Sequence, residues 1–186
     1  VTGSVDGEGD SDTLQGDLID AVVLTAVNAD GADGTEDSIS GGFSNIETLT
    51  GNGGTLTGLN ADAAWDLDGS PTYTSGGNAV SFSGFAALQG GSMVDTFNVT
   101  SPSNTSLPAG DYKGVFDVDA AVTGSVDGEG DSDTLQGDLI DAVVLTAVNA
   151  DGADGPEDSL SGGCSNIQTP TGNGGALPRL DALAAM

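Results

Sequence analysis

The feature that most constrains this chain is a perfect internal repeat. Residues 1–34 recur without a change as residues 122–155, which sets the repeat period at 121 residues. A fixed period predicts an architecture in which neighbouring units stack and bury a shared core. We therefore divide the chain into one full period, residues 1–121, and a partial second copy, residues 122–186.

The second copy is degenerate after residue 155. Cys164 stands in place of Phe43, and Pro170 stands in place of Leu49. Terminal repeats of stacked arrays are commonly atypical, so one interpretation is a capping repeat and the other is a sequence artefact. Because the chain starts at Val1, in register with an internal repeat, we expect it to be a piece of a longer protein.

Glycine and the short β-branched runs favour strands joined by turns. Glycine supplies 31 of 186 residues, against an average of about 7%, and each glycine inside a strand or helix costs about 0.5–1 kcal/mol relative to alanine. We therefore expect most glycines in turns. Alternating apolar residues predict strands at residues 65–67, 72–74, 80–83, 97–100 and 115–119, and the β-branched residues of 18–27 favour a further strand. The tail from Leu177 is predicted to become helical.

A smaller period lies inside the large one. The stretch FSNIETLTG at residues 43–51 matches FSGFAALQG at residues 82–90, and a degenerate third stretch begins at Phe116. Each has apolar anchors six residues apart, followed by an insert of variable length. Insertions that project from stacked coils are typical of a solenoid. The period then divides into units of roughly 1–42, 43–81 and 82–121.

Two all-β architectures remain open for such a chain. The first is a right-handed parallel β-helix or β-solenoid, whose narrow core suits the low aromatic content of 4%. The alternative is a tandem array of immunoglobulin-like β-sandwich domains, for which 121 residues per domain is a reasonable size. In either case we expect each unit to stack on neighbouring repeats of the parent chain.

The charge of the chain restricts its partners. Two basic residues face 29 acidic ones, and the formal net charge is −27. Because phosphates and anionic lipids are bound through Lys and Arg, we expect neither nucleic acid nor an anionic membrane as a partner. Cations are the expected partners, although an acidic surface also simply keeps a long fibre soluble. The lone Cys164 has no disulfide partner, which leaves repeat stacking or bound metal to stabilise the fold.

The acidic residues are concentrated in one repeated stretch. Carboxylates alternate along residues 6–12 and again along residues 127–133, and calcium prefers oxygen ligands of this kind. The stretch departs from an EF-hand loop, because Ser11 occupies the position that demands glycine. We predict calcium ligands among the carboxylates of these stretches and at one further aspartate: Asp6, Glu8, Asp10, Asp12, Asp95, Asp127, Glu129, Asp131 and Asp133.

One set of motifs resembles a known group of proteins. The stretch beginning at Phe82, continued by Gly90, Gly91, Asp95 and Phe97, is similar to the repeats of giant bacterial haemagglutinin-like and RTX-type adhesins. That resemblance implies an extracellular or cell-surface β-helix exported by a Gram-negative cell, often with calcium between its turns. The sequence departs from the RTX nonapeptide in having Met93 where its third glycine belongs.

Enzyme chemistry is disfavoured by the residues present. The chain has no histidine, which excludes Ser-His-Asp and Cys-His sites within it and removes a usual zinc ligand. We predict a non-enzymatic structural or adhesive segment of a large bacterial surface or secreted protein, stabilised by calcium and contacting surface glycans or proteins. The alternatives are a calcium-dependent array of immunoglobulin-like adhesin domains and, more remotely, a carbohydrate-active β-helix. Trp65 and Tyr73 are core residues in the first interpretation and a sugar-stacking surface in the last.

Overall fold

The regular secondary structure of the described residues consists of strands. The structure is a computed structural model that describes residues 1–140 and 144–173, and no helix occurs in these ranges. Consequently none of their segments is a helix that could cross a membrane. The predicted helical tail from Leu177 lies outside the described residues.

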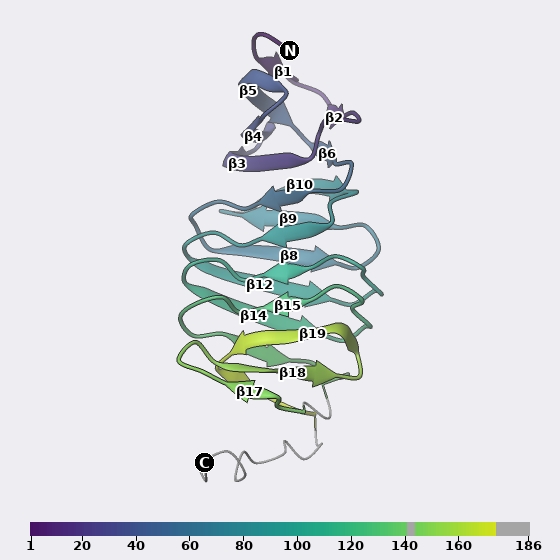
Figure 1. Ribbon diagram of the computed structural model, residues 1–186. Helices are drawn as coiled ribbons and strands as arrows, with labels where there is room; N and C mark the ends of the chain where they lie inside the picture. Colours follow the sequence, from purple (N-terminus) through teal and green to yellow (C-terminus); the bar gives the residue numbers. More distant parts are fainter. Residues whose placement is uncertain (141–143, 174–186) are drawn as a thin grey trace.

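The strands are stacked along the long axis of the molecule (Figure 1) and form three sheets, of which the second takes strands from residue 13 to residue 170. The first sheet has the order β1 (Val5–Asp6), β5 (Ile39–Ile46), β4 (Gly31–Glu36), β3 (Ala21–Asn28), β7 (Thr55–Thr57) and β11 (Ala87–Gln89). The second has the order β2 (Thr13–Gln15), β6 (Thr48–Thr50), β10 (Asn78–Ser83), β9 (Thr72–Ser75), β8 (Ala63–Leu67), β12 (Val94–Val99), β14 (Lys113–Val118), β16 (Thr134–Gln136) and β20 (Thr169–Pro170). The third has the order β13 (Leu107–Pro108), β15 (Val126–Asp127), β19 (Leu160–Ile167), β18 (Ala153–Glu157) and β17 (Ala147–Val148).

Parallel pairing runs without interruption from β8 to β20 in the second sheet. Phe97 of β12 pairs with Phe116 of β14, and Phe116 pairs in turn with Leu135 of β16, so the partners are spaced at residues 97, 116 and 135. Each step is therefore 19 residues long. Burial alternates along these strands, so the paired residues lie on the inner face of the sheet. One hydrophobic cluster there contains side chains from all three sheets. The predicted strands at residues 65–67, 72–74, 80–83, 97–100 and 115–119 and the predicted strand within 18–27 are confirmed, with boundaries shifted by a few residues.

Antiparallel hairpins are inserted at three places in the parallel pattern. They comprise β3–β4–β5, β8–β9–β10 and β17–β18–β19. Figure 1 shows β8, β9 and β10 as neighbouring strands. Where a hairpin intervenes, parallel partners lie farther apart in sequence, as with Leu14 and Leu49. The all-β prediction is confirmed, and the sheets are mixed rather than wholly parallel.

The stacking register differs from the one suggested by the smaller sequence period. The matching stretches would place Phe43 level with Phe82, yet Phe43 pairs with Val5 in the first sheet while Phe82 pairs with Leu49 in the second. The inserted hairpins shift which anchor of each stretch lies in which sheet. The proposed unit boundaries at residues 42 and 81 stay predictions.

Most of the described glycines lie outside strands, as expected, but several occupy strands. Gly34 lies in β4, where an added Cβ would come within 2.5 Å of the Phe43 ring. Gly41 lies in β5, where an added Cβ would come within 2.6 Å of the Gly3 backbone. A turn at residues 29–30 joins β3 to β4. Close approach of the backbone and an aromatic ring, rather than chain reversal, requires glycine at positions 34 and 41.

Candidate functional site

The two acidic stretches form loops that each connect a strand of one sheet to a strand of another. Acidic loop 1 (residues 6–12) connects β1 to β2, and acidic loop 2 (residues 127–133) connects β15 to β16. In loop 1 the Asp6 Oδ1 accepts hydrogen bonds from the Glu8 N–H at 3.0 Å and from the Asn45 Nδ2 at 2.8 Å. These hydrogen bonds, the one from the Glu8 N–H first, hold the pKa of Asp6 below its usual value.

Loop 2 repeats this arrangement. The Asp127 Oδ1 accepts from the Glu129 N–H and from the Asn166 Nδ2, both at 2.9 Å. Glu8 and Glu129 take the left-handed backbone conformation, with φ of 62° and 57°, which few residues other than glycine adopt. The loop conformation is therefore specified by the repeated sequence and recurs in both copies.

Each acidic loop ends in an aspartate with a carboxylate oxygen that lacks a partner. Asp133 is fully buried; its Oδ1 accepts a hydrogen bond from the Gly114 N–H, while its Oδ2 has no partner. Burial raises the pKa of Asp133 to about 6, and the nearby charges of Asp131, Asp127 and Glu129 raise it further. The Oδ2 of Asp12, the equivalent residue of loop 1, is also buried and without a partner. A buried oxygen without a partner lowers the free energy of unfolding unless a proton or a cation binds to it.

The two loops differ in one neighbouring side chain. The Asp12 N–H donates to the Glu47 Oε2 at 2.7 Å, whereas the Asp133 N–H donates to the Gln168 Oε1 at 2.6 Å. Loop 1 therefore has an additional carboxylate beside its terminal aspartate. Loop 2 also receives the Gly114 N–H and the Gln89 side chain, for which no counterpart at loop 1 is found among the described residues.

The residues of the loops fit calcium better than a metal that demands side-chain ligands only. Within residues 1–140 and 144–173, no three His, Cys, Asp or Glu side chains are already gathered around one point. An ion at these loops would have to complete its coordination with backbone carbonyl oxygens and water, as calcium readily does. The unpartnered carboxylate oxygens are the observation that favours such an ion.

Asp95, the other predicted calcium ligand, lies in a different environment. It is fully buried, and its two oxygens accept hydrogen bonds from the Trp65 Nε1 and the Gly91 N–H, each at 2.8 Å. Desolvation raises its pKa to about 6, although both hydrogen bonds oppose the shift. Asp95 thus orients the Trp65 indole in the core, and its role as a metal ligand stays a prediction.

Trp65 and Tyr73 form no sugar-stacking surface, because both side chains are fully buried. Trp65 stacks on Phe97 with ring centroids 5.6 Å apart, and Tyr73 meets the edge of Trp65 at 4.5 Å. The Tyr73 hydroxyl accepts a hydrogen bond from the Leu59 N–H at 2.8 Å, and burial raises the pKa of Tyr73 to about 12. The core interpretation of this pair is confirmed.

Two buried glutamates were missed by sequence reasoning. Glu36, at the end of β4, accepts hydrogen bonds through its Oε2 from the N–H and the hydroxyl of Ser38, while its Oε1 is buried without a partner. Glu157 and Ser159 repeat this arrangement in the second copy. The available signal was the tripeptide Glu-Asp-Ser retained in both copies despite the change from Thr35 to Pro156.

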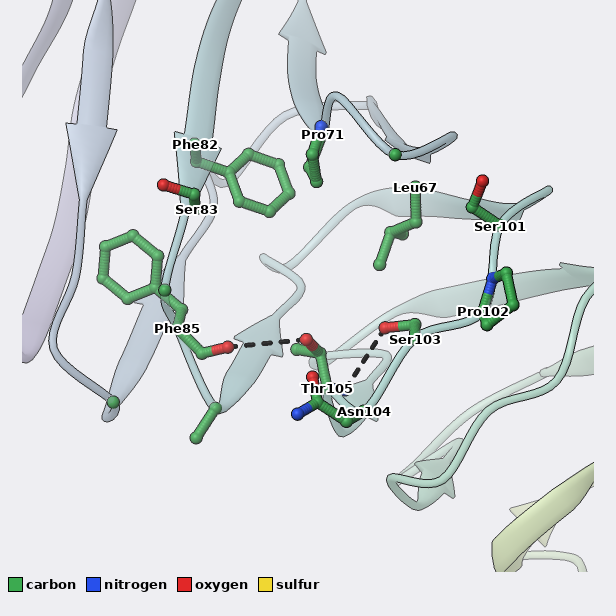
Figure 2. A pocket seen from close by; sticks show the side chains of 14 residues that line it. Leu67, Pro71, Phe82, Ser83, Phe85, Ser101, Pro102, Ser103, Asn104 and Thr105 are labelled. Atoms are coloured by element: carbon green, nitrogen blue, oxygen red, sulfur yellow. Dashed lines mark hydrogen bonds between the residues drawn. The ribbon is translucent and has the colours of Figure 1, made fainter.

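A separate hollow of about 460 Å³ opens where two turns meet the end of β10 (Figure 2). Phe82, Phe85, Pro71 and Leu67 supply its apolar lining, and the turn at residues 101–105 supplies hydroxyl and amide groups. The Thr105 hydroxyl is tied to the Phe85 carbonyl oxygen at 3.4 Å. Its lining residues include no ionisable side chain, which distinguishes it from the acidic surface of the chain and suits an uncharged group.

Comparisons with known proteins add nothing to this assignment. A scan against protein-family models, a search of curated proteins and a search of solved structures each found no match. The residues of the acidic loops, the buried carboxylates and the hollow therefore carry the functional argument by themselves.

Proposed function

We propose that this chain is a structural, adhesive repeat segment of a large bacterial surface or secreted protein, built as a right-handed parallel β-solenoid. The observation that supports it best is the joining of the two copies. Val126 and Leu135 of the second copy pair in parallel with Leu107 and Phe116 of the first, and both copies contribute to one hydrophobic cluster. Units that share a core in this way behave as a continuous rod rather than as separate domains.

The parallel pairings favour the solenoid over the immunoglobulin-like alternative. Immunoglobulin-like sandwiches are built from antiparallel sheets, whereas β12, β14 and β16 pair in parallel at steps of 19 residues. A step of this length matches a single coil of about 20 residues. The antiparallel hairpins are then insertions at the side of the coils.

Calcium is the proposed partner of the acidic loops. Asp12 and Asp133 each direct a buried, unpartnered oxygen into a loop of further carboxylates, and a cation there would offset both the desolvation and the mutual repulsion of these groups. Asp6, Glu8 and Asp10 surround the first position in sequence, and Asp127, Glu129 and Asp131 the second. Backbone carbonyls and water would supply the remaining ligands.

The adhesive contact is proposed at the uncharged hollow beside Phe85. A surface glycan presents hydroxyl groups and apolar ring faces without charge, and the hollow combines apolar rings with the polar turn at residues 101–105. A negatively charged surface elsewhere would repel anionic ligands. This location supports an uncharged saccharide rather than an acidic one as the ligand.

Thermal melts with calcium test the proposed ion sites. Binding to the folded state alone raises the melting temperature by mass action, so calcium added at constant ionic strength should raise it above the value in chelator. Glu47→Gln makes loop 1 resemble loop 2 and should reduce the calcium-induced rise. The double variant Asp12→Asn with Asp133→Asn should nearly abolish it. A rise of equal size in the double variant would contradict the assignment to these loops.

Stepwise shortening tests the architecture independently of calcium. A solenoid loses stability gradually as coils are removed from its end, whereas separate sandwich domains are lost in blocks of one domain. Chains shortened from the C-terminal side by successive steps, followed by urea unfolding, should show a graded fall in midpoint. Loss of all structure on removal of a single 40-residue unit would contradict the solenoid.

A further inference from the structure

The hollow beside Phe85 has an apolar side that belongs to the core. Leu67 ends β8, Pro71 precedes β9 and Phe82 lies in β10, so the inserted hairpin supplies this side. Figure 2 shows the Phe82 ring directed toward Leu67, and these two side chains are only 6% and 5% exposed. The volume of about 460 Å³ falls within the usual range of small-molecule sites. A ligand that fills the hollow therefore meets core side chains.

The polar side of the hollow is the turn at residues 101–105, which follows β12. The Ser103 Oγ accepts a hydrogen bond from the Thr105 N–H at 3.2 Å, and the Thr105 hydroxyl donates to the Phe85 carbonyl oxygen at 3.4 Å (Figure 2). A hydroxyl group has one proton to donate and two lone pairs to accept with. Among the described residues, the Ser103 proton has no acceptor and the Thr105 Oγ1 has no donor. The turn thus offers a ligand one hydrogen-bond donor and one acceptor.

These two sides together define the group that fits between them. A secondary amide has one carbonyl oxygen and one N–H, which complement the free donor of Ser103 and the free acceptor of Thr105. A hydroxyl of the ligand placed against Phe82 and Leu67 would lose its hydrogen bonds to water without replacement, whereas a methyl group would not. The lining includes no ionisable side chain, so a charged group would also be desolvated without compensation. A neutral amide that carries a methyl group satisfies all these conditions.

We propose that this hollow binds the acetamido group of an N-acetylated amino sugar. The inference rests on the saccharide contact proposed above and specifies which class of saccharide is bound. The methyl group packs against Phe82 and Leu67, the Ser103 hydroxyl donates to the acetyl carbonyl oxygen, and the Thr105 Oγ1 accepts from the amide N–H. The sugar ring stays at the rim, where the exposed Asn104 side chain can bind ring hydroxyls. Ser103 and Thr105 are then the residues that determine specificity.

Two simple glycosides test the proposal on the unaltered chain. The methyl glycosides of N-acetylglucosamine and of glucose differ only in the acetamido group that replaces one ring hydroxyl. Titrations followed by NMR should give about tenfold or more tighter binding of the N-acetylated glycoside, because sites that match a substituent discriminate to this degree. Equal affinities would overturn the inference and leave the broader saccharide proposal in place. Absence of binding by either glycoside would overturn both.

A peptide is the competing occupant, because it also presents methyl groups beside amides. N-acetylalanine methylamide carries these groups without a sugar ring and is titrated in the same way. It should bind more weakly than the N-acetylated glycoside, since it lacks the ring hydroxyls that Asn104 would bind. Tighter binding of this compound would show that the hollow takes a peptide and would overturn the assignment to a sugar.

A matched pair of variants locates the binding. Ser103→Ala removes the donor to the acetyl carbonyl and should reduce the preference for the N-acetylated glycoside by about fivefold, the usual effect of one hydrogen bond. The control Ser101→Ala is the same substitution in the same turn, and Figure 2 shows the Ser101 hydroxyl directed away from the Phe82 ring. It should leave the preference unchanged. Thermal melts establish that both variants are folded. An unchanged preference in Ser103→Ala, or an equal loss in both variants, would contradict the assignment.

Discussion

At the residue scale, the buried carboxylates are the most informative groups of the chain. Among the described residues, four buried side-chain oxygens lack a partner, and the repeat relates them in two pairs: Asp12 with Asp133, and Glu36 with Glu157. Because the equivalent oxygen lacks a partner in both copies, the repeated sequence itself causes this arrangement. Buried polar groups without partners are rare in folded proteins, and each is expected to have a cause.

The substitution Asp133→Asn tests the cost of that buried charge. The asparagine retains an oxygen for the Gly114 N–H but removes the negative charge facing Asp127, Glu129 and Asp131. In chelator near pH 7.5 we expect the free energy of unfolding to increase by about 1–3 kcal/mol, the cost of an unsatisfied buried group. Urea unfolding measures this change. Asp12→Asn, at a less buried position, is the matched control and should stabilise less; a destabilised Asp133→Asn would refute the argument.

Stability should also depend on pH in an unusual direction. The pKa values of Asp95 and Asp133 are raised to about 6, above the 3.8 of an ordinary aspartate, so between these values the folded state binds more protons than the unfolded state. The free energy of unfolding should therefore rise as the pH falls from about 7 to about 5. Urea unfolding in chelator at constant ionic strength measures it. A fall in stability over this range would contradict the prediction, and Asp133→Asn should weaken the dependence.

At the element scale, the strands β8, β12 and β14 hold the core through stacked rings. Phe97 lies between Trp65 and Phe116, with centroids 5.6 Å and 5.1 Å away and ring planes within 11° and 10° of parallel. Parallel strands in register place equivalent side chains one above another, and this ladder is a direct consequence. The Asp95 carboxylate fixes the Trp65 indole at one end of the ladder.

Truncation of the central ring should be severe. Phe97→Ala removes a fully buried ring from the middle of the ladder, and such changes cost about 3–5 kcal/mol. Chemical denaturation should show this loss of unfolding free energy, with little change in its slope against denaturant concentration. Tyr112→Ala, at a side chain that is 49% exposed, is the control and should change stability by less than about 0.5 kcal/mol. A similar loss in both variants would show that the ladder is not the main source of stability.

At the scale of the whole molecule, the chain joins a shared core to a strongly acidic surface. The formal net charge of −27 opposes compaction, while the core spans the parallel ladders of both copies. Self-repulsion acts across the entire surface and is screened by salt. Calcium at the two acidic loops would act locally, in addition to that general effect.

Plain salt should therefore stabilise the chain even in chelator. Raising sodium chloride from about 0.05 M to about 0.5 M shortens the Debye length well below its value of about 10 Å at 0.1 M, and the melting temperature should rise. Differential scanning calorimetry measures this rise. A lower or unchanged melting temperature would show that surface repulsion is unimportant here. The calcium experiment needs this baseline, because only a rise in melting temperature beyond the one caused by sodium chloride indicates bound calcium.

The sequence by itself determined the repeat, the all-β class, most strands and the repeated acidic loops, because periodicity and alternation are local properties of a chain. Only the tertiary structure decided the register that pairs Leu49 with Phe82, the burial of Asp95 against Trp65 and the glycine at position 34 beneath the Phe43 ring. These depend on contacts between distant residues, whose alignment is shifted by inserted hairpins. For the same reason, identical residues of the two copies differ in their partners: β15 and β16 pair with residues 107–108 and 115–117, whereas β1 and β2 pair within the described residues with β5 and β6.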